Sequence, residues 1–173
     1  DSSINGGSIV NSGTIQSSNE AVRLGGRNVL LDLRLGSSIS GQITVAADSN
    51  NTLRLNSVYH YISDGGRDGS PGNVLLGSYG DDASLYNTLE ISIRKSGGYM
   101  DGDVWNDGHG SLNTDGQRDI TNARLGLDLE GADIAAGDTF DILHAGQGIV
   151  GSFYGLGAED MRADEYGNTF RTV

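Results

Sequence analysis

The chain has 173 residues, of which 28 are Gly, one is Pro and none is Cys, and its formal net charge is −12. This charge argues against nucleic acid as a partner, because duplex binding needs clustered positive charge. The absence of Cys excludes disulfides and thiolate chemistry, and no apolar run reaches the roughly 20 residues of a membrane-spanning helix. Interior glycines each cost a helix about 0.5–1 kcal/mol relative to Ala, so the glycine content favours a fold with many tight turns.

Residues 1–56 predict short strands separated by polar turns. Apolar and polar residues alternate at 31–35 and at 52–55, which is the pattern of a half-buried strand. Turn residues separate the apolar runs, as Gly25-Gly26-Arg27-Asn28 does between Val22–Leu24 and Val29–Leu33. Apolar rows this short cannot form a core alone, so successive strands must stack, with a repeat of about 20 residues. We therefore expect regular coils over residues 1–56.

Residues 57–119 predict further coils with loop insertions. Loop residues gather at Asp64–Asn73, which includes the single proline, and at about Asp101–Asp119. A strand is predicted at Thr88–Ile93, with Leu89, Ile91 and Ile93 on one face. Residues 120–173 predict the C-terminal coils. The fold class predicted for residues 1–173 is a single elongated all-β domain, a parallel β-helix (β-solenoid) with protruding loops.

Three segments, Gly7–Ile15, Val22–Leu33 and Gly36–Ile43, resemble the passenger domains of Gram-negative autotransporters. The later residues 127–129, 137–143 and 148–153, with Leu156, resemble the closing part of such passengers. The resemblance implies a right-handed parallel β-helix at a bacterial cell surface, acting as an adhesin or a scaffold. It implies no catalytic residue. The start at Asp1, without Met or a signal peptide, favours a mature or excerpted exported product.

Acidic, glycine-rich loops supply the oxygen ligands that calcium prefers. The candidate ligands are Asp101, Asp103, Asn106 and Asp107 in one loop, and Asp64 and Asp68 in another. Tyr99 and Trp105 lie beside the first group and could form a stacking platform for a sugar ring. We therefore expect either no cofactor or a structural Ca²⁺.

Paired carboxylates leave an enzymatic alternative open. Asp81 with Asp82, or Asp101 with Asp103 and Asp107, could act as the acid and base of a polysaccharide-cleaving enzyme. Nucleophilic catalysis is disfavoured, because the three histidines are isolated from one another in the sequence, at His60, His109 and His144. Gly146–Gly151 formally fits a dinucleotide motif, but turn and strand residues follow it where that motif requires a helix. We expect no catalytic site.

A stack of coils has free strand edges at its ends, and these pair with other strands unless they are covered. We expect the chain to stack head to tail on itself, forming filaments where the contacts do not close into a ring, or to bind a host or matrix surface. The predicted function is an extracellular structural or adhesive β-solenoid, either a passenger-like segment or a self-assembling fibre subunit. The alternatives are a polysaccharide-cleaving enzyme and a non-catalytic glycan-binding module.

Overall fold

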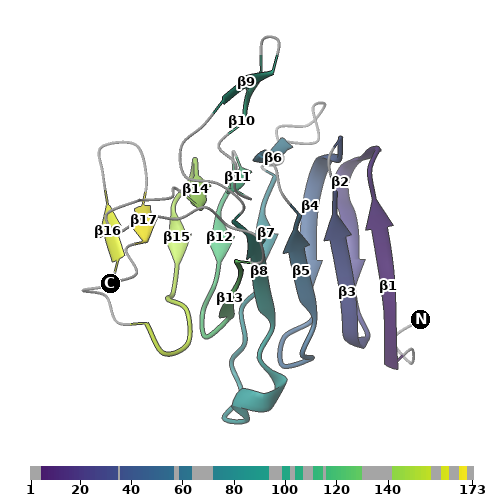
Figure 1. The fold of residues 1–173 in the computed structure, drawn as a ribbon. Coiled ribbons are helices and arrows are strands. Elements are labelled where there is room, and N and C mark those ends of the chain that lie inside the picture. The colour runs from purple at the N-terminus through teal and green to yellow at the C-terminus, as the bar shows by residue number, and fades with distance from the viewer. Residues whose placement is uncertain are drawn as a thin grey trace.

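The fold was analysed in a computed structural model, which describes residues 5–34, 36–56, 59–63, 72–93, 99–101, 104–106, 111–114, 116–129, 142–156, 161–163 and 168–170. Over these residues every regular element is a β-strand, apart from one short 3₁₀ helix, η1 (Ala83–Leu85), and the strands are joined by turns and irregular segments. Two large sheets of parallel strands and two short antiparallel hairpins make up the fold (Figure 1). The predicted all-β class is confirmed for the described residues.

The first sheet has five parallel strands, in the order β1-β3-β5-β8-β13. They are β1 (Asn5–Asn11), β3 (Arg27–Leu33), β5 (Thr52–Leu55), β8 (Thr88–Ser92) and β13 (Arg124–Asp128). Partners in neighbouring strands are 22 residues apart from β1 to β5 and 36 residues apart from β5 to β13. The first spacing agrees with the predicted repeat of about 20 residues, whereas the longer spacing was not predicted.

The second sheet is also parallel and follows the order β14-β11-β6-β4-β7-β12-β15, with β2 paired to β4. Its strands are β2 (Thr14–Leu24), β4 (Ser38–Val45), β6 (Tyr59–Ser63), β7 (Val74–Leu75), β11 (Ser111–Thr114), β12 (Arg118–Asp119), β14 (Leu143–Ala145) and β15 (Ile149–Val150). Between β1 and β5 the chain passes alternately from one sheet to the other.

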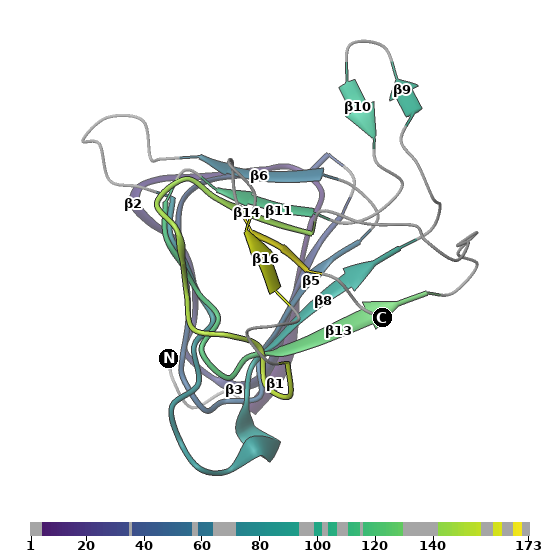
Figure 2. The same cartoon turned by 90° about the vertical axis from the view of Figure 1, so that its left-hand side faces the viewer.

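Strand β4 belongs to two faces of this second sheet. Ile39 and Ser40 pair with β6, whereas Ile43 and Thr44 pair with β7, so the strand bends between them. The bend lies at Gly41, whose φ of +120° favours glycine, and a Cβ there would lie 2.8 Å from the carbonyl oxygen of Ser17. The two faces and the first sheet together outline a triangle when the stack is viewed from its C-terminal end (Figure 2).

The interior of the triangle is filled by apolar side chains that point inward from alternate positions of the strands. Strand β4 shows this alternation along its whole length, and β5 repeats it. Leu89, Ile91 and Ile93 are all buried, which confirms their predicted common face. Full burial of each such side chain contributes about 1.5–3 kcal/mol. The main buried members are Leu31, Leu33, Ile39, Ile43, Leu53, Leu55, Val74, Leu76, Leu89, Ile91, Ile120 and Phe153.

The predicted loop at about Asp101–Asp119 is wrong in part. It contains β10 (Val104–Asn106), β11 and β12, and its first residue, Asp101, ends β9 (Tyr99–Asp101). The strands β11 and β12 form because parallel neighbours on both sides supply their hydrogen bonds: β12 lies between β7 and β15. In the other predicted loop, Asp64–Asn73, residues 64–71 lie outside the described residues.

The two ends of the stack differ. Strands β1 and β2 form its N-terminal end and have no further strand beside them among the described residues. Near the other end, β16 (Met161–Ala163) pairs antiparallel with β17 (Asn168–Phe170), and β17 contacts β14. Figure 2 shows this hairpin lying across the C-terminal end. No helix of the described part of the chain is long and apolar enough to cross a bilayer.

Candidate functional site

Four of the residues predicted to bind calcium or a glycan, Tyr99, Asp101, Trp105 and Asn106, fall on the hairpin β9–β10, which projects away from both sheets in Figures 1 and 2. The register places Asn106 opposite Tyr99 and Val104 opposite Asp101. The hairpin therefore brings Tyr99, Asp101 and Asn106 close together along its backbone. Trp105 lies opposite Met100, so it is not the register partner of Tyr99.

Several other predicted site residues lie outside the described residues. These are the calcium candidates Asp103 and Asp107, together with Asp64 and Asp68. Among the residues that the structure does describe, no three His, Asp or Glu side chains gather closely enough to hold a metal ion. The calcium site stays a prediction.

The carboxylate pair Asp81–Asp82 lies beside η1, and both side chains are exposed. Asp82 caps this helix: its Oδ1 accepts hydrogen bonds from the backbone N–H of Ser84 at 3.0 Å and from the Ser84 hydroxyl at 2.6 Å. These two bonds, the hydroxyl bond first, hold the pKa of Asp82 below its ordinary value. The carboxylate therefore has a structural partner and is stabilised in its ionised form.

The described histidines lie in two different strands, and the glycine motif lies in a turn and a strand. His144 is exposed on β14 and His60 lies in β6, while His109 is outside the described residues. The segment Gly146–Gly151 carries the turn between β14 and β15 and the strand β15 itself, with no helix in it. It therefore lacks the helix N-terminus that a dinucleotide phosphate requires.

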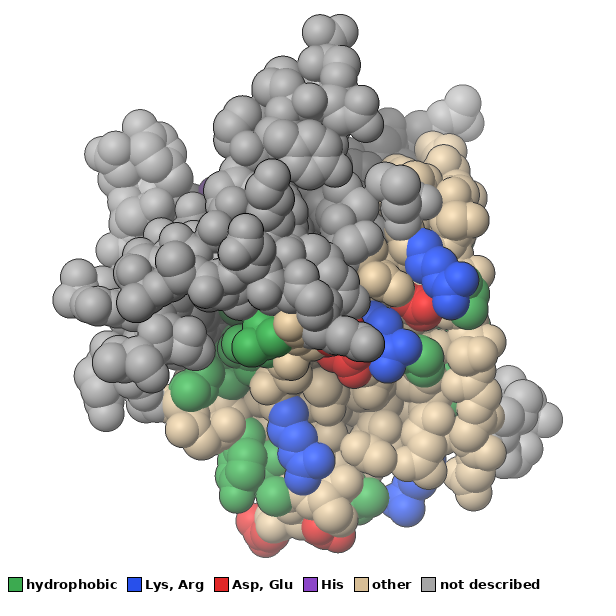
Figure 3. Space-filling model, in the orientation of Figure 1, with side chains coloured by type: hydrophobic (Ala, Val, Ile, Leu, Met, Phe, Trp, Pro, Cys, Tyr) green, Lys and Arg blue, Asp and Glu red, His purple; other side chains and the backbone are tan. Residues whose placement is uncertain are grey.

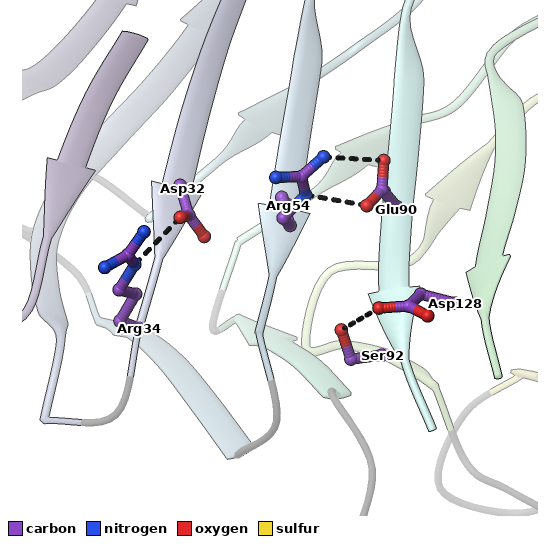
Figure 4. Close-up of polar contacts among 6 residues, drawn as sticks. All are labelled: Asp32, Arg34, Arg54, Glu90, Ser92 and Asp128. Carbon is purple, nitrogen blue, oxygen red and sulfur yellow. Dashed lines mark hydrogen bonds and ion pairs between the residues drawn. The ribbon is translucent and has the colours of Figure 1, made fainter. Parts of the chain in front are cut away.

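The charged side chains that the structure brings together lie on the outer face of the first sheet (Figure 4). Asp32, Arg54 and Glu90 occupy the same register position on β3, β5 and β8. Arg54 Nε donates to Glu90 Oε1 at 2.6 Å, and Arg54 Nη2 donates to Glu90 Oε2 at 3.4 Å. The hydrogen bond to Glu90 raises the pKa of Arg54. This charged row links strands that are adjacent in the sheet.

Two further polar pairs flank the charged row. Arg34 Nε donates to Asp32 Oδ2 at 2.9 Å, and the Ser92 hydroxyl donates to Asp128 Oδ2 at 3.4 Å. Asp32 is almost fully buried, and its Oδ1 has no hydrogen-bond partner among the described residues. Figure 3 shows acidic and basic side chains side by side on this face, without a large patch of either sign.

A second polar cluster joins three passes of the chain near η1. The Tyr79 hydroxyl donates to Asp119 Oδ2, and the backbone N–H groups of Tyr79 and Gly80 donate to Asp48 at 3.0 Å. The hydrogen bond to Asp119, followed by desolvation, raises the pKa of Tyr79 to about 12. The sequence does not reveal this cluster, because its members are brought together only by the stacking of the strands.

Arg118 is the most unusual polar residue of the described core. It is fully buried in β12, at the register position that Val74 holds in β7 and Ile149 holds in β15. Its Nη2 donates to the carbonyl oxygen of His144, while Nε and Nη1 have no acceptor among the described residues. Desolvation lowers the pKa of this guanidinium. Sequence reasoning assigned Arg118 to a polar loop and missed it.

A cavity of about 560 Å³ opens at the N-terminal end of the stack. Its walls include Gly6, Gly7, Ser8 and Ile9 of β1 and Leu24 at the end of β2. These residues are apolar or small, and Arg23 also lines the cavity. The cavity therefore suits apolar side chains better than a charged ligand.

Most of the polar contacts described above thus join side chains to one another or to the backbone, and one cavity lies beside β1 at the N-terminal end of the stack. No protein-family model, curated protein or solved structure matches this chain.

Proposed function

We propose that this chain is a right-handed parallel β-helix, a β-solenoid, with a structural or adhesive role outside a Gram-negative bacterial cell. The observation that carries the proposal is the continuous apolar row Ile9, Leu31, Leu53, Leu89 and Leu125, which runs in register through five parallel strands. A core of this kind grows by adding passes of the chain and needs no central cavity. Such a molecule is suited to spanning distance and presenting a surface.

The polar contacts of the described residues support a scaffold over an enzyme. Arg54 and Glu90 satisfy each other across two strands, and Asp82 caps η1. The buried side-chain amide of Asn87 also accepts a hydrogen bond from the backbone N–H of Asn51 on the neighbouring pass of the chain. Polar groups that are committed to their own backbone or to an opposite charge rigidify a structure. We therefore propose a non-enzymatic role.

The location at a bacterial surface rests on the resemblance to autotransporter passengers. The resembling segments Gly7–Ile15, Val22–Leu33 and Gly36–Ile43 cover parts of β1 to β4, including the turns from β1 to β2 and from β2 to β3. A net charge of −12 is compatible with a solvent-exposed surface protein.

We place the predicted ligand contacts, calcium through Asp101 and Asn106 and a glycan through Tyr99 and Trp105, on the projecting hairpin β9–β10. Calorimetric titration of the whole chain with Ca²⁺ tests the metal, with Asp101→Ala as the variant expected to bind more weakly. Asp81→Ala is the matched control, because Asp81 is an exposed carboxylate distant in sequence from the hairpin.

The surface role is tested by antibody labelling of the bacterium that produces the chain. Labelling of intact cells is expected, and labelling that requires lysis would contradict the proposal. A reducing-sugar assay over a panel of polysaccharides tests the enzymatic alternative. Turnover that Asp101→Ala or Asp103→Ala abolishes would replace the scaffold with an enzyme.

A further inference from the structure

Tyr79 has the largest exposed fraction among the large apolar and aromatic side chains that the structure describes. It is 62 % exposed and lies in the connection between β7 and β8. An aromatic side chain can remove about 150–250 Å² of surface from water when it is covered. Single exposed apolar side chains are nevertheless common on protein surfaces. A role for Tyr79 therefore has to be argued from the groups that hold its ring.

Both ends of Tyr79 are held by carboxylates. Its backbone N–H donates to Asp48 Oδ1 at 3.0 Å, and its hydroxyl donates to Asp119 Oδ2. The other oxygen of Asp119, Oδ1, accepts the backbone N–H of Thr121 at 3.0 Å, which fixes this carboxylate in turn. The ring is therefore held in one position although most of it is in contact with solvent. A ligand that binds a ring held in this way does not have to order it first, which favours binding.

A glycine makes the room for this contact. A Cβ on Gly77 would lie 2.5 Å from the hydroxyl oxygen of Tyr79 and 2.8 Å from each carboxylate oxygen of Asp119. Any other residue at position 77 would therefore push the hydroxyl and the carboxylate apart. The hydrogen bond that fixes the ring depends on the absence of a side chain at this one position.

The charges that flank the ring are both negative. Asp119 lies at its hydroxyl end, and Asp48 lies at its backbone end, where it also accepts the N–H of Gly80 at 3.0 Å. In the described part of the chain, neither carboxylate forms an ion pair with Lys or Arg. A carboxylate has about four acceptor positions, so both groups can accept further hydrogen bonds. The surroundings of the exposed ring therefore favour a cation that also donates hydrogen bonds.

We propose that Tyr79, with Asp48 and Asp119, binds an arginine side chain of a partner protein. A guanidinium stacks flat on an aromatic ring, to which the cation–π interaction attracts it. Its planar set of N–H groups can donate to a neighbouring carboxylate at the same time, which the compact ammonium of lysine matches less well. The net charge of −12 steers a basic partner toward the chain. This site adds a partner to the proposed scaffold and does not depend on where the chain is located.

A second exposed tyrosine lacks these flanking charges. Tyr154 is 53 % exposed, and its ring lies edge-on to that of Tyr86, with 5.2 Å between the ring centroids. Its other described partner is the carbonyl of Ala123, which accepts its backbone N–H, so no carboxylate holds it. Tyr154 thus offers a ring of similar exposure without the two negative groups, and Tyr154→Ala is the matched control for Tyr79→Ala.

Titration of the whole chain with the capped peptide Gly-Arg-Gly-Arg-Gly, followed by NMR chemical shifts, tests the site. We expect Tyr79→Ala to weaken binding about three- to tenfold, the range of a cation–π contact, and Tyr154→Ala to leave it unchanged. Peptides with lysine or with uncharged citrulline in place of arginine should bind more weakly. No binding to the wild type, equal binding of the citrulline peptide, or equal loss in the two tyrosine variants would overturn the proposal.

A second variant tests the charge beside the ring without removing the ring. Asp119→Asn keeps the size of the side chain and an acceptor for the Tyr79 hydroxyl, but it removes one negative charge. We expect it to weaken binding of the arginine peptide, and unchanged affinity would overturn the role of Asp119. Circular dichroism of each variant shows that the strand signal is retained, so that loss of binding is distinguished from loss of the fold.

Discussion

The backbone N–H of Asn51 donates to the side-chain oxygen Oδ1 of Asn87 at 3.0 Å, and both side chains are fully buried. The amide nitrogen of Asn87 donates in turn to the carbonyls of Ala46 at 2.9 Å and Leu76 at 3.1 Å. One amide thus satisfies three backbone groups from two successive passes of the chain, at the corner where each pass enters the first sheet. Before the following strand, β13, the equivalent position is Ala123, so the arrangement ends there.

Replacing this amide should destabilise the fold more than most single changes. Asn87→Ala leaves the N–H of Asn51 and the two carbonyls without their partner, and each buried unsatisfied group costs about 1–3 kcal/mol. We expect the free energy of unfolding to fall by about 3–5 kcal/mol in urea titrations. Asn19→Ala, at an exposed position of β2, is the control and should change it by less than about 0.5 kcal/mol.

Arg118 should be replaceable without loss. Its guanidinium stands in an apolar row with two nitrogens that lack acceptors among the described residues, and removal of a buried charge is often neutral or stabilising. We expect Arg118→Met to leave the free energy of unfolding unchanged or to raise it by up to about 3 kcal/mol. A fall beyond about 1 kcal/mol would show that the guanidinium has a stabilising partner in addition to the carbonyl of His144. Arg27→Met, at an exposed position, provides the baseline.

The ion pair on the outer face should be weak and sensitive to salt. The side chains of Arg54 and Glu90 are 35 % and 26 % exposed, so solvent screens their attraction. A double-mutant cycle with Arg54→Gln and Glu90→Gln should give a coupling energy of about 0.5–1 kcal/mol, which declines in 1 M salt. Coupling that is independent of salt would indicate packing of the two side chains rather than charge.

The Tyr79 hydroxyl should ionise at a higher pH than an ordinary tyrosine. Its pKa is raised from 10.0 to about 12, chiefly by the hydrogen bond to Asp119. Because the pKa is higher in the folded state, the protonated Tyr79 hydroxyl stabilises the fold fully below pH 10. This contribution to the free energy of unfolding is lost as the pH rises toward 12. The difference in tyrosinate absorbance between the wild type and Tyr79→Phe reports this titration. Asp119→Asn should move it back toward pH 10, whereas Asp81→Asn should leave it in place.

The core rows could be predicted because their information is local. Leu53 and Leu55 alternate with Thr52 and Arg54, and a period of two residues assigns them to one face whatever their neighbours are. The bend at Gly41 and the second face of the sheet could not be predicted in this way. They depend on which strand lies alongside each half of β4.

Among the polar sites, too, those formed by residues close in sequence could be predicted, and those formed by strand pairing could not. The hairpin residues Tyr99, Asp101 and Asn106 could be grouped from the sequence because they are near one another along the chain. The contact between Arg54 and Glu90 spans 36 residues and exists only in one register of β5 against β8. Composition and spacing do not encode that register, because the apolar rows permit more than one length of chain between strands.

The connection that leads from the second sheet to the first differs in length between successive passes of the chain. Residues 76–87, including η1, connect β7 to β8, whereas residues 120–123 connect β12 to β13, and Thr88 still lies opposite Arg124. The longer connection bulges outward without disturbing the strands beside it. Lengthening a closed loop costs little entropy per added residue. A foreign peptide grafted between Asp81 and Ser84 should therefore be displayed to solvent while the strands keep their pairing, which makes this corner a natural position for carrying an epitope or an affinity tag.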